Sequence, residues 1–327
     1  MSIIKPFLFF SFLVVATCSH AKALIIGQDI PYFYYEDKTN SLSLELLLSL
    51  PQENLIESKK TLSKGYTEST FWIKFDVNDK AFSNNEYWFE VLPVYLDRIE
   101  FYYKEDSSNT WIKRSAGDLN NAAEWDVDYR APVFILPKSS DGYSVVIKVT
   151  TSSSMLLNVR IWKEHDFIGY SLKDNIFWSF FFGVFSFAGM ILLLLALVLG
   201  GRIFWISFFS FFVYFDLFCM HGYYEWFFGK SPLHIQHYLT SLSFIAIFSV
   251  VLLACSEIIG LRERFNKIYK VMLFIIYLIS FQSVFVIFDM YFLVIKNILF
   301  FFMLVVLFYF LVIYIVFIKR NLVSCIF

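Results

Sequence analysis

Charged residues are scarce in this sequence, and their distribution is uneven. Asp, Glu, Lys and Arg make up 17% of the 327 residues, whereas a soluble domain carries about 25%. The charges crowd the first half, and the second half contains long runs without any. The net charge is −1 and no long basic run occurs, so there is no reason to expect a nucleic-acid partner. We therefore expect one region that folds in water and another that folds in lipid.

Cysteines and catalytic motifs are also scarce. The four cysteines are Cys18, Cys219, Cys255 and Cys325. None lies between Leu24 and Asp166, so we expect that region to fold around a large core without disulfides. The sequence contains no CxxC or Cys/His metal spacing, no nucleotide-binding glycine loop and no G-x-S-x-G. We predict no catalytic residue, no cofactor and no bound metal.

Residues 1–23 have the pattern of a cleaved signal peptide. Lys5 supplies a positive start, and Phe7–Ala16 is an apolar run too short to span a bilayer. Ala21 and Ala23 form an A-x-A pattern, which predicts cleavage after Ala23. Two alternatives are a lipoprotein signal with Cys18 acylated and a retained anchor helix.

Residues 24–168 show the period-two alternation of β-strands, most clearly in Phe71–Val77. The predicted strands are Phe71–Val77, Tyr87–Leu92, Arg98–Lys104, Trp111–Arg114, Val133–Leu136, Tyr143–Thr150 and Leu156–Trp162. Short strands separated by turn residues at this spacing indicate an antiparallel β-sandwich, whose sheets each have one solvated side. A short helix is expected at Ser43–Leu50.

Several aromatic side chains of this domain could stack on a sugar ring, because an aromatic face offers a large and rigid contact area. They are Trp88, Trp111, Trp125, Tyr102 and Tyr103. The alternative is that Trp72, Trp88 and Tyr102 belong to the core. Trp125 lies in a polar loop, and loops carry binding residues more often than scaffold strands do. The predicted ligand-binding residues are Trp111, Trp125, Asp128 and Arg130.

A series of short blocks carries a family resemblance. The blocks are Tyr34–Asp37, Leu42–Glu45, Gly65, Phe71–Phe75, Trp88–Val91, Leu96–Tyr102, Gly117–Asp118 and Arg130–Phe134. The order of these blocks resembles that in bacterial seven-transmembrane receptors with diverse intracellular signalling modules. The resemblance covers the extracellular sensor domain and the first part of the membrane region. The resemblance implies a jelly-roll-like β-sandwich similar to carbohydrate-binding modules. It also implies a small extracytoplasmic ligand, with carbohydrate as one candidate class.

Residues 175–318 are apolar enough to form a bundle of transmembrane helices. A span needs about 20 apolar residues to cross about 30 Å of hydrocarbon. The five predicted spans are 177–199, 203–220, 238–259, 271–288 and 292–318. Lys and Arg are concentrated in alternate connections and in the tail at 319–327, whereas the connection at 221–237 has only Lys230. By the positive-inside rule, the β domain lies outside the bacterial inner membrane and the C-terminus lies in the cytoplasm.

Ionisable residues within the spans are costly and usually face a partner. We predict that Asp216 and Lys296 pair inside the bundle; the alternative is that each reaches water at the outer surface. The outer connection also contains four residues with zinc-ligating atoms, His221, Glu225, His234 and His237. Their spacing matches no compact zinc motif, so we interpret this connection as an ordinary hydrated loop.

The family resemblance implies seven spans followed by a cytoplasmic output module such as a histidine kinase, a diguanylate cyclase or a phosphatase. The sequence stops at Phe327, just after the fifth predicted span. We therefore expect a truncated receptor, or a protein that works as a homodimer or with a separate cytoplasmic signalling partner. The predicted function is a membrane sensor that transmits ligand binding across the bilayer. Alternatives are a transport or envelope-assembly component that docks through its β domain, and a membrane enzyme that uses the outer histidines.

Overall fold

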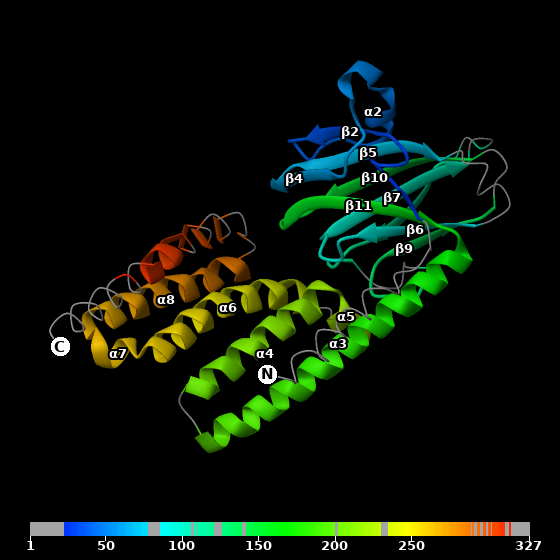
Figure 1. Cartoon of the computed structure of the whole chain (residues 1–327). Coiled ribbons are helices and arrows are strands. Elements are labelled where there is room, and N and C mark those ends of the chain that lie inside the picture. Colours follow the sequence, from blue (N-terminus) through cyan, green and yellow to red (C-terminus); the bar gives the residue numbers. More distant parts are fainter. Residues whose placement is uncertain are drawn as a thin grey trace.

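The computed structural model shows a β domain followed by a group of helices (Figure 1). It describes residues 23–77, 86–105, 108, 110–120, 126–138, 142–199, 202–229, 235–288, 290, 293–294, 297–298, 300–301, 303–310 and 314. The predicted signal peptide lies outside these residues, apart from its last position. The predicted fold class, an antiparallel β-sandwich followed by apolar helices, is confirmed.

Two antiparallel sheets form the β domain. The six-stranded sheet consists, in spatial order, of β3 (Ile56–Ser58), β2 (Tyr32–Asp37), β5 (Thr70–Val77), β10 (Tyr143–Thr150), β7 (Arg98–Glu105) and β8 (Ile112–Ala116). The five-stranded sheet consists of β1 (Leu24–Ile25), β11 (Ser154–Trp162), β6 (Tyr87–Leu92) and β9 (Val133–Leu136), with β4 (Leu62–Tyr66) also paired to β11. Strands distant in sequence are neighbours in both sheets, so the domain closes only when its first and last strands are in place.

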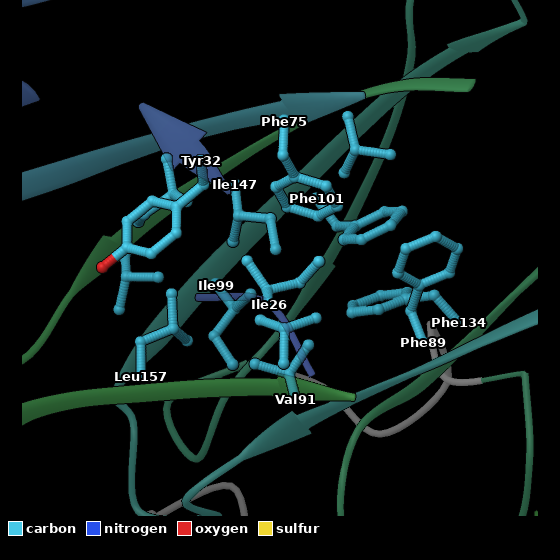
Figure 2. Close-up of a cluster of buried hydrophobic side chains, with 14 of the residues drawn as sticks. Ile26, Tyr32, Phe75, Phe89, Val91, Ile99, Phe101, Phe134, Ile147 and Leu157 are labelled. Atoms are coloured by element: carbon cyan, nitrogen blue, oxygen red, sulfur yellow. The ribbon is translucent and has the colours of Figure 1, made fainter. Parts of the chain in front are cut away.

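The core lies between the inner faces of the two sheets (Figure 2). Phe101 of β7 stacks on Phe134 of β9 with ring centroids 4.5 Å apart, and Phe89 of β6 lies 5.3 Å from Phe101. All three side chains are fully buried. Burying one such side chain stabilises a fold by about 1.5–3 kcal/mol. A core of this kind explains how the domain closes without a disulfide.

A short helix covers part of the outer face of the six-stranded sheet. Helix α2 (Leu44–Ser49) is preceded by its N-cap Ser43, whose side chain accepts a hydrogen bond from the Leu46 amide. A single 3-10 turn (Gln52–Asn54) follows it. Leu47 of α2 packs on Trp72, and Tyr102 lies against the same cluster. Of the three residues in the core alternative, Trp72 and Trp88 are buried and Tyr102 is half-buried. The two tryptophans belong to clusters on the outer faces of the sheets and not to the core between them.

The helical part begins without a linker, because only Lys163 separates β11 from the next helix. The helices are α3 (Glu164–Leu199), α4 (Arg202–Met220), α5 (Tyr223–Phe228), α6 (Ile235–Ile259), α7 (Leu261–Arg264) and α8 (Asn266–Ile287). Described residues between 293 and 314 are also helical. By length and composition α3, α6 and α8 can cross a membrane, and Phe204–Met220 is a shorter apolar helix.

Helix α3 is the longest of the elements that the structure describes. Its 36 residues extend about 54 Å at 1.5 Å per residue, from the five-stranded sheet to the far end of the helical group (Figure 1). Large apolar side chains such as Phe180, Leu197 and Val198 are exposed along it. An apolar surface of this size is stable in lipid and not in water. The helix therefore starts in the β domain and continues into the membrane.

Candidate functional site

The outer face of the five-stranded sheet is where the β domain meets the helices (Figure 1). Phe167 of α3 lies 5.3 Å from Trp88 of β6 and 6.2 Å from Trp162 of β11, measured between ring centroids. Tyr170, on the same side of α3, stacks on Trp162 at 4.6 Å. Residues at i and i+3 share one face of a helix, so the first turns of α3 pack on the sheet.

Glu90 of β6 is buried in this interface. Its Oε2 accepts a hydrogen bond from Trp162 Nε1 (3.1 Å) and lies 3.6 Å from the guanidinium of Arg160. That guanidinium also donates to the Tyr170 hydroxyl on α3, 3.1 Å away. Among the residues that the structure describes, Glu90 Oε1 has no hydrogen-bond partner. Burial raises the pKa of Glu90, although Arg160 and Trp162 oppose the shift.

Arg130, in the loop before β9, joins three segments of the chain. Its guanidinium pairs with Asp174 of α3 and donates a hydrogen bond to the carbonyl oxygen of His221, 3.1 Å away. The rings of Tyr129 and Tyr223 lie 5.4 and 5.3 Å from the guanidinium carbon, within cation–π distance. Burial alone lowers the pKa of Arg130, but Tyr129 and Asp174 raise it by more, so the guanidinium stays charged.

His221 and Gly222 form the turn between α4 and α5. The His221 ring lies 3.9 Å from Trp178 of α3, and burial followed by the charge of Arg130 lowers the pKa of His221 to about 4. Gly222 has a φ of +78°, and a Cβ at this position would lie 2.5 Å from the carbonyl oxygen of Arg130. Only glycine satisfies both the backbone angle and this close approach. The turn therefore packs directly against the loop that contains Arg130.

His237, in the first turn of α6, faces two buried carboxylates of the β domain. Its Nδ1 lies 3.3 Å from Asp118 Oδ2 and 3.7 Å from Asp97 Oδ1. The other oxygen of Asp97 accepts hydrogen bonds from the amide and hydroxyl of Ser152, each at 2.7 Å. Thr151 Oγ1 donates to Asp97 Oδ1 at 3.2 Å. The β domain thus contacts α6 through a polar cluster separate from that of Arg130.

A cavity of about 170 Å³ adjoins this cluster. Asp118 and Tyr95 line it from the β domain, and Asp216 of α4 and His237 of α6 line it from the helices. Asp216 is held by Ser243 of α6, whose hydroxyl donates to Asp216 Oδ1 at 2.8 Å. The cavity therefore lies at the junction of the β domain with two of the helices.

A second cavity, of about 370 Å³, lies beside α2 on the outer face of the six-stranded sheet. Leu47 and Leu50 line it from the α2 side and Phe33 from β2, while Lys74 and Asp76 of β5 supply charged groups. Small-molecule sites typically have about 300–1,000 Å³ of space, mostly apolar walls and a few polar groups. This cavity has those properties and lies away from the helices.

The structure places the predicted ligand-binding residues on opposite faces of the β domain. Trp111 is half-buried on the outer face of the six-stranded sheet. Asp128 accepts a hydrogen bond from Trp226 Nε1 of α5 (3.1 Å), near Arg130 at the interface with the helices. Trp125 lies outside the described residues. Asp128 and Arg130 thus share a region that excludes Trp111, and a ligand-binding role for all four stays a prediction.

The polar residues of the membrane region give a mixed outcome. Asp216 is buried and bonded to Ser243, but Lys296 lies outside the described residues, so their pairing stays a prediction. The interpretation of 221–237 as a hydrated loop is wrong for Glu225 and His237, which are buried. Loops of the β domain contact this connection at Gly222, Trp226 and His237. His234 also lies outside the described residues.

Sequence reasoning did not single out Glu90, Asp97, Asp118 or Asp174 as site residues. Two signals were available. Glu90 interrupts the otherwise apolar run of β6, and Asp174 is the last charge before the apolar part of α3. Such positions suggest a paired charge. Nothing in the sequence indicates that Asp97 and Asp118 lie beside His237, because 119 positions separate Asp118 from His237.

Comparison with known protein families gives a match within the β domain. Residues 32–163 match the family model described as 7TMR-DISM extracellular 2, from the first residue of β2 to the single residue that precedes α3. The match thus covers nearly the whole β domain. No curated protein matches the chain. The matched family is a receptor and sensor domain and not an enzyme family. The β domain therefore matches the extracellular domain of the 7TMR-DISM receptor family, and helices long and apolar enough to cross a membrane follow it.

Proposed function

We propose that this protein is a membrane sensor whose β domain binds a small molecule outside the cytoplasm and passes the binding event to its membrane helices. The observation that carries the proposal is the direct connection of β11 to α3 through Lys163. A helix that leaves the sheet without a linker, and packs on it through Phe167 and Tyr170, moves with the domain. Arg130 adds a second connection to Asp174 and His221.

The cavity beside α2 is the proposed ligand site, with sugars as the first class to test. Its apolar wall and the charged groups of Lys74 and Asp76 suit a small polar molecule with one apolar face. Trp111 and Tyr102 lie in the hydrophobic cluster on the same face of the sheet. Aromatic rings elsewhere on this face offer further contact area for a longer sugar.

The proposed location is the inner membrane of a bacterium, with the helix ends distant from the β domain in the cytoplasm. His237 at the start of α6 contacts the β domain, and α7 lies at the opposite end of α6 (Figure 1). Arg262 of α7 and Lys267 of α8 are exposed at that end. Basic residues favour the cytoplasmic side of a membrane. The recipient of the signal is then a second copy of the chain or a cytoplasmic partner.

A distance measurement tests the proposal. The full chain in nanodiscs, with its native cysteines replaced, is spin-labelled at Lys113 in β8 and Arg262 in α7, both of which are exposed. A thermal-shift screen of sugars and other small molecules supplies a ligand. We expect that ligand to change the Lys113–Arg262 distance. A ligand transmits a signal only if it binds one conformation of the protein more tightly than the other and so shifts the population between them. A label pair within the β domain, Lys113 and Glu57, should keep its distance.

The variant Lys74→Ala should weaken ligand binding, whereas Lys59→Ala, an exposed lysine outside the cavity, should not. A ligand that binds through Lys74 but leaves the Lys113–Arg262 distance unchanged would contradict a sensing role. That result would favour a docking function for the β domain. Failure of every compound to bind would contradict the proposed ligand class.

A further inference from the structure

Three metal-ligating side chains from separate segments meet where the β domain touches α6. Asp97 immediately precedes β7, Asp118 follows β8, and His237 lies in the first turn of α6. Their exposed fractions are 6%, 3% and 6%. One ligand atom of each lies within 4.8 Å of the other two. The group is thus buried, close together and contributed by both parts of the molecule.

The backbone brings the two aspartates together without any help from the helices. The Asp118 amide donates to the carbonyl oxygen of Leu96, and the Leu119 amide donates to that of Asp97, each at 3.0 Å. Gly117 has a φ of +115°, and a Cβ there would lie 2.4 Å from the Asp97 carbonyl oxygen. Glycine allows the two loops to approach this closely. The carboxylates are therefore positioned by the fold of the β domain.

Asp97 is also oriented as metal ligands usually are. Ser152 donates two hydrogen bonds of 2.7 Å to its Oδ2, which leaves Oδ1 on the side of His237 Nδ1. Thr151 supports Oδ1 with a hydrogen bond of 3.2 Å. Hydrogen bonds from an outer shell of this kind fix the direction of ligating carboxylates.

The charges of the group favour a cation. Two buried carboxylates lie beside His237 Nδ1 and repel each other, so positive charge at this point, from a bound cation or a protonated imidazole, is favourable. Zinc holds nitrogen and oxygen ligands at about 2.0–2.2 Å, so two ligands of one ion lie about 3–4 Å apart. The separations of 3.3 and 3.7 Å from His237 Nδ1 agree with this geometry. Magnesium and calcium prefer shells made of oxygen alone, which the imidazole does not supply.

The cavity of about 170 Å³ reaches two members of the group, Asp118 and His237. Such a space gives an ion a route of entry and gives a water molecule room to complete a shell of four ligands. Sites with three protein ligands and one open position are a common form of zinc centre. We propose that Asp97, Asp118 and His237 bind a divalent transition-metal ion of the zinc class and so tie the β domain to α6. This proposal is independent of the proposed sensing function.

Metal binding is measured on the full chain, purified without a polyhistidine tag, reconstituted in nanodiscs and stripped with a chelator. After equilibration with zinc chloride, mass spectrometry counts the retained metal. We expect one zinc ion per chain and a melting temperature that rises with zinc concentration. The variants His237→Gln and Asp118→Asn should lower zinc affinity by roughly 100-fold or more, because loss of an outer-shell partner alone costs 10- to 100-fold. His165→Gln changes an exposed histidine and serves as the matched control.

A cobalt titration of the unaltered protein avoids any loss of folding in the variants. Cobalt(II) bound by nitrogen and oxygen in a four-ligand shell absorbs visible light, and added zinc should abolish that absorption. The proposal is overturned if the unaltered protein retains no zinc, or if well-folded His237→Gln and Asp118→Asn proteins retain as much as His165→Gln. A histidine–aspartate ion pair alone would give that result. Displacement of zinc by equimolar calcium or magnesium would overturn the zinc-class assignment.

Discussion

The guanidinium of Arg130 pairs with the carboxylate of Asp174, so an ion pair joins the loop before β9 to the helix that enters the membrane. The two side chains are only 7% and 18% exposed. The pair lies beside the rings of Tyr129 and Tyr223, which keep water away from the guanidinium. Breaking this pair should therefore lower the free energy of unfolding more than breaking an ion pair on the surface does.

Arg130→Ala and Asp174→Asn should each destabilise the protein by about 3 kcal/mol, because removing one partner leaves a buried charge uncompensated. Replacing both residues by apolar side chains of similar size should recover most of the loss. Lys113→Ala is the matched control. It breaks the exposed Lys113–Glu100 pair and should cost no more than about 1 kcal/mol. Tryptophan fluorescence during unfolding in nanodiscs measures the difference, and equal losses for Arg130→Ala and Lys113→Ala would contradict the prediction.

Glu90→Gln should change how stability depends on pH. Burial raises the pKa of Glu90 above its usual 4.5, so the folded protein holds the proton at pH values where the unfolded chain has released it. Stability from this group is present below pH 4.5 and is lost as the pH rises through the raised pKa. The melting temperature of Glu90→Gln should therefore increase relative to the unaltered protein as the pH rises from about 4 to about 8. Parallel curves for the two proteins would show that Glu90 does not titrate in this range.

His221→Gln should act in the opposite sense. The pKa of His221 falls from 6.5 to about 4 because the ring is buried and lies near Arg130. The unfolded chain takes up a proton below pH 6.5 while the folded protein does not, so stability present above pH 6.5 is lost as the pH falls toward 4. His221→Gln should lose less stability over this window. The exposed His165 gives a control, since His165→Gln should follow the unaltered protein in melting curves recorded between those pH values.

Sequence patterns predicted the elements that alternate regularly. The bounds of β6, β9 and β10 agree with the predicted strands at Tyr87–Leu92, Val133–Leu136 and Tyr143–Thr150. Strands β2, β3 and β4 were not among the predicted strands. Ile56–Ser58 and Leu62–Tyr66 are short and largely exposed, so their sequences do not alternate, and pairing with a neighbouring strand keeps them extended.

The contacts between the β domain and the helices could not be predicted in the same way. Helix α3 begins at Glu164, whereas the predicted span began at residue 177. The charged residues among its first ten positions did not indicate that this segment belongs to the same helix as the apolar span. Arg130 was predicted as a ligand-binding residue and is the last residue of the polar stretch that contains Trp125, whereas its partner Asp174 lies 44 positions away. Contacts between residues so far apart in the sequence depend on how the sheet and the helices pack. Periodicity reports only which face of each element is apolar.

Gly222→Ala should weaken the contact between the α4–α5 turn and the β domain. Its φ of +78° disfavours any side chain, and a Cβ would also lie 2.5 Å from the Arg130 carbonyl oxygen and 2.8 Å from Val94 Cγ1. Gly65→Ala separates the two effects, since Gly65 has a φ of +66° with nothing within 4 Å of its Cβ position. The backbone angle alone costs about 1–2 kcal/mol.

We therefore expect Gly65→Ala to lower stability by about 1 kcal/mol and Gly222→Ala to lower it by clearly more, because the Arg130 loop must move away from the turn. Gly183→Ala, within α3 and without contacts at its Cβ position, should be neutral or slightly stabilising. Movement of the Arg130 loop would also lengthen its hydrogen bond to the His221 carbonyl. Hydrogen exchange of the segment around Arg130 should then increase in Gly222→Ala and not in Gly65→Ala. Equal losses of stability in these two variants, with unchanged exchange, would show that the turn does not support the β domain.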